Sequence, residues 1–258
     1  MAMDICVCVK RVPGTGSTIL LTDDGMNVDT RHLGFTIGPH EECAVEEAVQ
    51  IVTAHGGSVT VLTAGPPEAE EQLRYALSLG ADRGVLIDTG PEELDAEQTA
   101  SALTQAIRQL ESGGSRFDML LFGNESADAS HYQVGIRVAC ALELPMVGGV
   151  KGIQIDEAAG TLDLRRDAAG GIEVYRTPLP AAVAVAEGLN LPRYPSMRGR
   201  LRAMKARLDT VEVQLEPGGL RKRGLRRPAE QGSQTVMLGT GPEAADAVAD
   251  VLEELGVV

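Results

Sequence analysis

Tryptophan and paired-cysteine motifs are missing from this 258-residue sequence. It has no Trp and only 3% aromatic residues, so it lacks the aromatic side chains on which single-stranded nucleic acids stack. Its cysteines, Cys6, Cys8, Cys43 and Cys140, form no C-x-x-C pair, and neither they nor the histidines show the spacing of zinc ligands. The cysteines are therefore predicted to be reduced thiols of a cytoplasmic protein.

Long hydrophobic runs and an excess of basic charge are missing as well. No run approaches the roughly eighteen apolar residues of a membrane span. Met1 to Val9 has no basic start followed by a long apolar stretch, so no signal peptide is predicted there. The formal net charge of -14 argues against a general nucleic-acid-binding protein. The remaining composition, 43% hydrophobic and 23% charged, is that of a globular protein with a sizeable core.

The first half of the chain alternates between short apolar runs and amphipathic segments. Short runs rich in Val, Ile and Leu are typical of strands buried in a parallel sheet, whereas apolar residues that recur every three or four positions indicate helices. The alternation predicts βαβ units, and therefore an α/β fold with a mostly parallel sheet and helices on both faces. The expected strands are residues 4–9, 58–62, 84–87 and 118–122, and the expected helices are 41–54, 68–79, 95–110 and 136–144.

The pattern changes after Pro145. Three segments alternate apolar and polar side chains and are separated by turns with Gly and Asp, which predicts a small antiparallel insertion at about 148–177. The apolar run 180–185 is expected to return to the main sheet as a buried strand. The three alternating segments are 150–155, 161–165 and 171–175.

The C-terminal region has a different composition. From Pro217 the chain is rich in Gly, Arg and Pro, and a last amphipathic helix begins near Pro242. Such a helix packs either on its own domain or on a partner, and a linker of about 20 polar residues is longer than compact domains usually need. We therefore expect an α/β domain at residues 1–215 and a C-terminal arm at 216–258 whose helix packs on a partner subunit.

The stretch from Gly123 to Gly135 is the strongest candidate for a ligand site. It lies between an expected strand and an expected helix. In an open parallel sheet, ligands bind at the carboxyl ends of the strands, where the N-terminus of the next helix suits a phosphate. A simpler interpretation also stands, in which the loop is polar for ordinary reasons and Asp128 or Ser130 caps the helix. The side chains able to hydrogen-bond a sugar or base are Asn124, Ser126, Asp128, Ser130 and Gln133.

Several segments, in order along the chain, resemble the β subunit of electron transfer flavoproteins. The most distinctive is Glu187 to Ser196, which is similar to the family's signature loop with its Asn-x-Pro-Arg-Tyr/Phe core. The resemblance runs from about Met3 to Arg207, and five motifs in the right order make it specific. The other four motifs are 9–13, 44–49, the βα segment that contains 64–66 and 76–84, and 123–135.

The resemblance implies an adenine nucleotide alpha hydrolase-like fold and a heterodimer with a larger electron transfer flavoprotein α subunit. In this family the α subunit carries the redox-active FAD, and the β subunit holds a structural AMP. The chain would then be an electron-carrier subunit and not an enzyme, and no catalytic set of side chains can be picked out in its sequence. The implied nucleotide contacts are Cys8, Val9, Gly38, Pro39, His40, Glu41, Ala64, Gly123, Asn124, Glu125, Ser126, Ala127, Asp128, Ala129, Ser130, His131, Tyr132, Gln133 and Val134.

The signature loop is implied to be part of a docking loop at residues 187–200 that contacts acyl-CoA dehydrogenases or other flavin dehydrogenases. Met197 stands where the family has an apolar anchor, and methionine adapts to several partners. Basic residues around it would form a positive rim. Without the resemblance, a solvated surface loop would be the simpler interpretation. The implied docking residues are Pro192, Arg193, Tyr194, Met197, Arg198 and Arg200.

Two other functions stay open. One is a bifurcating-type subunit that binds a second FAD. Members of that type tend to carry a fuller Thr-Ala-Gln-Val-Gly-Pro run, whereas this chain has only Gln133-Val-Gly135 before Ile136, which favours AMP. The other is a stand-alone adenine-nucleotide-binding protein of the universal-stress type. The chain also departs from the family at Gly14, where Asp is common, and at His40, where aromatic residues are frequent.

Overall fold

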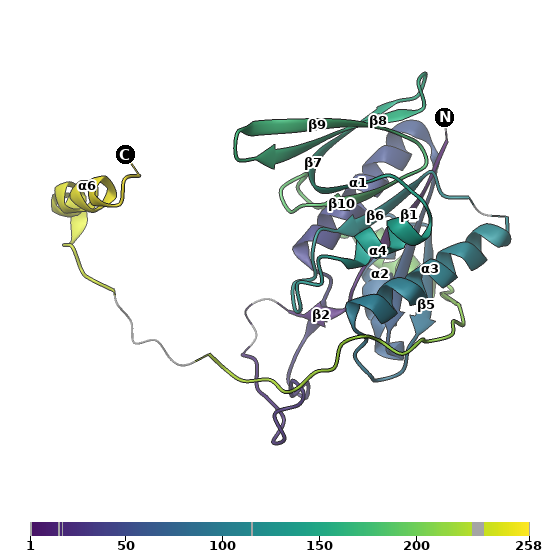
Figure 1. Ribbon diagram of the computed structural model, residues 1–258, viewed down its shortest axis with the longest axis horizontal. Coiled ribbons are helices and arrows are strands. Elements are labelled where there is room, and N and C mark those ends of the chain that lie inside the picture. The colour runs from purple at the N-terminus through teal and green to yellow at the C-terminus, as the bar shows by residue number, and fades with distance from the viewer. Residues whose placement is uncertain (1, 15, 17, 115, 229–234, 258) are drawn as a thin grey trace.

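A nine-stranded sheet forms the centre of the protein in the computed structural model, which describes residues 2–14, 16, 18–114, 116–228 and 235–257 (Figure 1). Neighbouring strands from β11 to β7 are parallel, and β8 and β9 extend the sheet in antiparallel fashion. In sheet order the strands are β11 (Asp209–Thr210), β5 (Arg83–Asp88), β4 (Gly57–Gly65), β1 (Met3–Cys8), β6 (Met119–Gly123), β10 (Ala181–Val185), β7 (Met146–Asp156), β8 (Thr161–Ala168) and β9 (Gly171–Pro178).

Helices cover both faces of the sheet, which confirms the predicted α/β class. Because side chains alternate along a strand, β1 sends Ile5 and Val7 into one hydrophobic core and Cys6 and Cys8 into the other. The first core lies under α1 (Pro39–His55), α2 (Glu70–Leu79) and α5 (Met197–Lys205), and the second lies under α3 (Ala96–Ser112) and α4 (Val134–Ala141).

Local signals in the sequence set the helix ends. At the start of α3, Asp95 Oδ1 accepts from the Gln98 N–H at 2.8 Å and Gln98 Oε1 accepts from the Asp95 N–H at 3.2 Å, so the two residues form a capping box. The helix α4 ends at Ala141, earlier than expected, because Glu143 adopts a positive φ of 56° and the Leu144 N–H turns back to the Ala139 carbonyl.

Gly57 is the glycine on which the start of the sheet depends. Its φ is +112°, and a Cβ placed there would lie 2.1 Å from the carbonyl oxygen of Met3. No side chain fits at this point, so glycine is required for β4 to begin beside β1.

The predicted antiparallel insertion is present as β7, β8 and β9, and the run 180–185 returns as β10 between β6 and β7. The docking loop expected at residues 187–200 is shorter in the structure. The helix α5 already begins at Met197, because Ser196 Oγ accepts from the Gly199 N–H at 3.0 Å and caps it. The two short strands β2 (Val12–Pro13) and β3 (Phe35–Thr36) pair as a separate small sheet.

The chain after β11 runs back along α3 and is held there by side-chain amides. Gln98, Gln105 and Gln109 donate from Nε2 to the carbonyl oxygens of residues 216, 214 and 212, at 3.1, 2.9 and 2.9 Å. We call these three residues the glutamine ladder. Farther on, the Leu225 N–H donates to the Gly25 carbonyl at 2.7 Å. This part of the predicted arm is therefore attached to the α/β domain.

The last helix, α6 (Ala245–Glu254), follows the 3-10 turn η2 (Gly241–Ala244) and stands apart from the rest in Figure 1. None of its residues is buried. Residues 229–234 of the predicted linker lie outside the described residues. Within the described part of the chain, no helix is long and apolar enough to cross a membrane.

Candidate functional site

A cavity of about 630 Å³ lies where β1, β4 and β6 end. It is the edge of the sheet at which the sequence places the ligand, and its volume is in the range typical of small-molecule sites. Four separate stretches of the predicted site converge on it. The predicted nucleotide residues that line the cavity are Cys8, Val9, Glu41, Ala64, Gly123, Glu125, Ser126, Asp128, Ala129, His131 and Val134.

The other predicted nucleotide residues lie next to the cavity without lining it. Asn124 Oδ1 accepts from the Gly149 N–H at 2.8 Å, which ties the loop to β7. Gln133 Oε1 accepts from Arg137 Nε at 2.7 Å at the start of α4. Ser130 takes a positive φ of 56° within the loop. The whole group comprises Gly38, Pro39, His40, Asn124, Ala127, Ser130, Tyr132 and Gln133.

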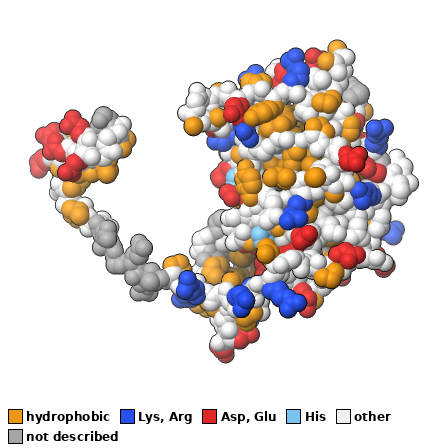
Figure 2. Space-filling model, in the orientation of Figure 1, with side chains coloured by type: hydrophobic (Ala, Val, Ile, Leu, Met, Phe, Trp, Pro, Cys, Tyr) orange, Lys and Arg blue, Asp and Glu red, His pale blue; other side chains and the backbone are white. Residues whose placement is uncertain are grey.

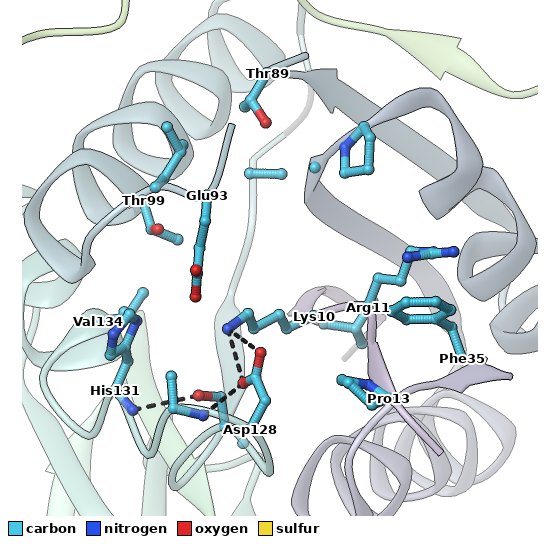
Figure 3. Close-up of a pocket in the computed structure, with 18 of the residues that line it drawn as sticks. Lys10, Arg11, Pro13, Phe35, Thr89, Glu93, Thr99, Asp128, His131 and Val134 are labelled. Carbon is cyan, nitrogen blue, oxygen red and sulfur yellow. Dashed lines mark hydrogen bonds and ion pairs between the residues drawn. The ribbon is translucent and has the colours of Figure 1, made fainter. Parts of the chain in front are cut away.

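Lys10 and Asp128 form an ion pair across the mouth of the site. Lys10 Nζ donates to both carboxylate oxygens of Asp128, at 2.7 and 2.6 Å (Figure 3). Burial acts to raise the pKa of Asp128, but the charge and hydrogen bonds of Lys10, together with hydrogen bonds from Ser126 and the Ala129 N–H, hold that pKa below its ordinary value. Asp128 is therefore a carboxylate that fixes the loop against β1, and its charge is already balanced by Lys10.

Glu41 is a buried acid at the first turn of α1. Its residue is 4% exposed, and burial raises the pKa of its carboxyl group to about 7, with a smaller contribution from Asp128. Two glycines make room for this side chain. A Cβ on Gly38 would lie within 2.2 Å of Glu41 Oε2, and a Cβ on Gly123 would lie 2.9 Å from Glu41 Cδ.

The N-terminus of α1 points into the same corner. Its N-cap residue, Gly38, supplies no capping side chain, and Pro39 has no N–H to satisfy. The backbone nitrogen of Glu41 lies 3.2 Å from the position of a Cβ on Gly123, so this helix end faces the loop that begins at Gly123. A helix end of this kind attracts an anion, because its free N–H groups and its dipole both favour negative charge.

Several residues that the sequence did not predict complete the walls. The guanidinium carbon of Arg11 lies 3.3 Å from the centre of the Phe35 ring, on the side of the cavity away from His131 (Figure 3). The loop after β5 contributes residues 91–94, and the C-terminal arm contributes Lys222 and Leu225. The sequence carried a signal for Lys10, Arg11 and the loop after β5, since each comes shortly after the end of a strand of the parallel sheet. No pattern in the sequence pointed to Lys222, because it reaches the site only through the path of the arm.

The predicted docking residues divide into two kinds. The guanidinium of Arg193 forms two hydrogen bonds with Glu46 of α1, at 2.7 and 2.8 Å, so it anchors the signature loop to the domain. Burial acts to raise the pKa of Glu46, but Arg193 and Gln50 together hold that pKa below its ordinary value. By contrast, Tyr194 and Met197 are 93% and 74% exposed. Arg198 and Arg200 are also exposed, and Pro192 is half-buried.

The fold and the cavity together define a class of protein, an α/β protein with a small-molecule cavity at the carboxyl edge of a parallel sheet. Among the described residues, no group of three or more His, Cys, Asp or Glu side chains could hold a metal ion.

Comparison with known proteins gives the family. The family model described as "Electron transfer flavoprotein domain" matches residues 25–216. The chain is 34% identical over 214 residues to the electron transfer flavoprotein subunit beta of Bacillus subtilis (strain 168), a match that covers 82% of this chain and 79% of that protein. It is 36% identical over 232 residues to the subunit beta of Mycobacterium leprae (strain TN), covering 86% and 85%.

A third relative carries a different name. Protein FixA of Sinorhizobium fredii is 35% identical over 240 residues, covering 91% of this chain and 81% of that protein. The chain belongs to the electron transfer flavoprotein β-subunit family, and the resemblance seen in its sequence is confirmed.

Proposed function

We propose that the chain is the β subunit of a heterodimeric electron transfer flavoprotein with an AMP in its cavity. It accepts electrons from flavin dehydrogenases through the FAD of an α subunit and passes them to a downstream acceptor. The observation that carries the nucleotide assignment is the convergence of the α1 N-terminus and the Gly123 loop on one cavity. No side chain of this chain takes part in the redox chemistry, which the flavin supplies.

The residues present fit an adenylate. The N-terminus of α1 and the loop from Gly123 to Asp128 suit its phosphate, because the dipole of the helix favours negative charge there. Polar side chains such as Ser126 and Thr99 line the rest of the wall. Because the contacts come from segments far apart in the chain, bound nucleotide stabilises the folded domain by mass action.

A second FAD in this chain is the other candidate, and the extent of the cavity favours it. The walls continue past the Gly123 loop to Arg11, Phe35 and residues 91–94, so a ligand longer than an adenylate has room to extend (Figure 3). The stacked Arg11 and Phe35 offer a flat, positively charged surface at that end.

The direct test is to denature the purified complex and identify the small molecules released by mass spectrometry. We expect AMP and FAD in equal amounts, one of each per heterodimer. Two FAD per heterodimer and no AMP would support the second candidate. Isolation of the chain as a lone, colourless protein that hydrolyses ATP would contradict both and point to a protein of the universal-stress type.

The α subunit is proposed to cover two apolar surfaces. Hydrophobic side chains gather over the face that carries β7–β9 and α4 (Figure 2), where Ile172 and Val174 are 69% and 60% exposed. On the arm, Leu252 of α6 and Leu255, directly after the helix, are exposed. Monomeric proteins rarely expose such surfaces without a partner.

Truncation of Met197 tests the dehydrogenase-docking surface. We expect Met197→Ala to slow reduction of the heterodimer's FAD by a dehydrogenase about tenfold, because an exposed apolar anchor contributes on the order of 1–2 kcal/mol to an interface. Stopped-flow reduction measures the rate, and the AMP content should not change. Met204→Ala is the matched control, since Met204 is similarly exposed, at 73%, two turns along the same helix. Equal rates for both variants and the unaltered protein would show that docking occurs elsewhere.

A further inference from the structure

Glu41 has a carboxyl oxygen that the fold buries without a hydrogen-bond partner. The residue is 4% exposed and lines the cavity, and its Oε2 has no hydrogen-bond partner. A buried, unpaired carboxylate is costly, so its retention calls for a reason. The position of the Glu41 side chain also depends on two glycines, since the absence of a Cβ at both Gly38 and Gly123 leaves the space in which it lies.

The carboxyl group lies where an anionic ligand would be held. Glu41 belongs to the first turn of α1, and a hydrogen bond from its own backbone N–H acts to lower its pKa. That N–H is one of those the helix end would otherwise offer to a phosphate. The side chain therefore occupies the helix N-terminus from within the protein, on the side of the loop that begins at Gly123.

The charges around Glu41 come from three elements. The loop after β6 contributes Asp128, which acts to raise the pKa of Glu41, and Glu125. Lys10, at the end of β1, acts to lower it, while Glu42 on α1 itself acts to raise it. His40 is also on α1, and its Nε2 lies 3.8 Å from Glu125 Oε1. Lys10 is already paired with Asp128, so a phosphate that approaches Glu41 meets uncompensated negative charge.

We infer that Glu41 determines the affinity of the site for phosphate-bearing ligands, because its carboxyl group competes with the ligand's phosphate for the N-terminus of α1. This inference rests on the proposed nucleotide site. A phosphate is accommodated when Glu41 is protonated, since the neutral acid no longer repels it and can donate a hydrogen bond to it. Binding of a nucleotide is therefore coupled to uptake of a proton.

The sign of the pH effect follows from that coupling. Burial raises the pKa of Glu41 to about 7, and a phosphate placed beside it would raise that pKa further. Below pH 7 the proton is already present and binding is strongest. Above pH 7 the proton must be taken up, so the affinity falls by as much as about tenfold for each pH unit.

The experiment is equilibrium dialysis of the full-length protein, in the complex with which it purifies, against labelled AMP at pH 6.5 and pH 8.5. Bound nucleotide is first removed by extended dialysis. We expect AMP to bind about tenfold more weakly at pH 8.5 than at pH 6.5. Glu41→Gln should remove this loss and bind AMP more tightly than the unaltered protein at pH 8.5. Adenosine, which has no phosphate, should show no such difference.

Two controls make the result specific. Glu42→Gln removes the same charge one residue along α1, but Glu42 accepts a hydrogen bond from the Tyr75 hydroxyl at 3.1 Å and is the smallest of the influences on the pKa of Glu41, so this variant should keep nearly the pH dependence of the unaltered protein. Second, AMP's own phosphate titrates with a pKa of about 6 in every variant, so only the difference between variants counts. The same pH dependence in Glu41→Gln and the unaltered protein would overturn the inference while leaving the nucleotide site in place. Absence of AMP binding by any variant at either pH would overturn the site itself.

Discussion

Replacing Gly123 with valine is expected to lower the free energy of unfolding by about 2–3 kcal/mol and to reduce the AMP content of the purified protein. A Cβ at this position would lie 2.9 Å from Glu41 Cδ and 3.2 Å from the backbone nitrogen of Glu41. The side chain of Glu41 is buried and cannot move aside into solvent, and the backbone of α1 is held by its own hydrogen bonds. The valine would therefore push α1 and the loop apart at the phosphate end of the cavity.

Urea denaturation and mass analysis of released nucleotide measure the two effects. Gly148→Ala is the matched control, because a Cβ at Gly148 meets nothing closer than 3.6 Å, so its stability should change by no more than about 0.5 kcal/mol. The double variant Gly123→Ala with Glu41→Ala should recover part of the loss caused by Gly123→Ala alone, since the clashing side chain is gone. Full stability and normal nucleotide content in Gly123→Val would mean that this loop is not part of the site.

Replacing Arg193 with alanine is the second substitution expected to have a large effect. The side chain of Glu46 is only 4% exposed, and removal of Arg193 leaves its carboxylate buried with Gln50 as its remaining side-chain partner. Breaking a fully buried pair costs about 3–5 kcal/mol. Because 44% of the Arg193 side chain is exposed and solvent screens the pair, we expect about 2 kcal/mol. The signature loop should also lose its fixed position on α1.

The effect of Arg193→Ala should depend on pH. With Arg193 present, the pKa of Glu46 is below its ordinary value, so the ion pair stabilises the protein at neutral pH and loses this effect as the pH falls through that pKa. The gap in stability between the unaltered protein and the variant should be largest near pH 7 and close toward pH 3. Adding Glu46→Gln should restore part of the loss. Arg198→Ala, at an exposed arginine nearby, is the control, and equal stability of the two arginine variants would show that the pair contributes nothing.

The parallel sheet and the edge that carries the cavity could be predicted from sequence because both follow from local patterns. Short apolar runs such as Met119 to Phe122 and helical periodicity between them leave few other arrangements, and parallel strands bring their carboxyl ends together. Cys8, Ala64 and Gly123, at the carboxyl ends of those strands, lie at the cavity as expected. Helix ends were less well predicted, since the end of α4 depends on the positive φ of Glu143.

The pairings within the site could not be predicted, because they join residues far apart in the chain. Nothing in the sequence indicates that Lys10 meets Asp128, or that Lys222 lies 2.8 Å from Glu93 and closes one wall. Arg193 shows the same limit. Its motif predicted a surface for partners, whereas the structure uses its guanidinium to hold the loop on Glu46. An exposed loop and an anchored one look alike in sequence when the anchoring acid lies on another helix.

The glutamine ladder on α3 has a consequence for how the arm can change. All three amides donate to main-chain carbonyls, at residues 212, 214 and 216, so they hold the chain that leads into the arm by its backbone and not by its side chains. Substitutions along that segment can therefore accumulate freely, provided that no bulky group lifts the backbone from the helix. Gln98, Gln105 and Gln109 themselves have no such freedom, because each amide is needed for its hydrogen bond. Two relatives could thus carry quite different arms, suited to different partners, on the same unchanged helix.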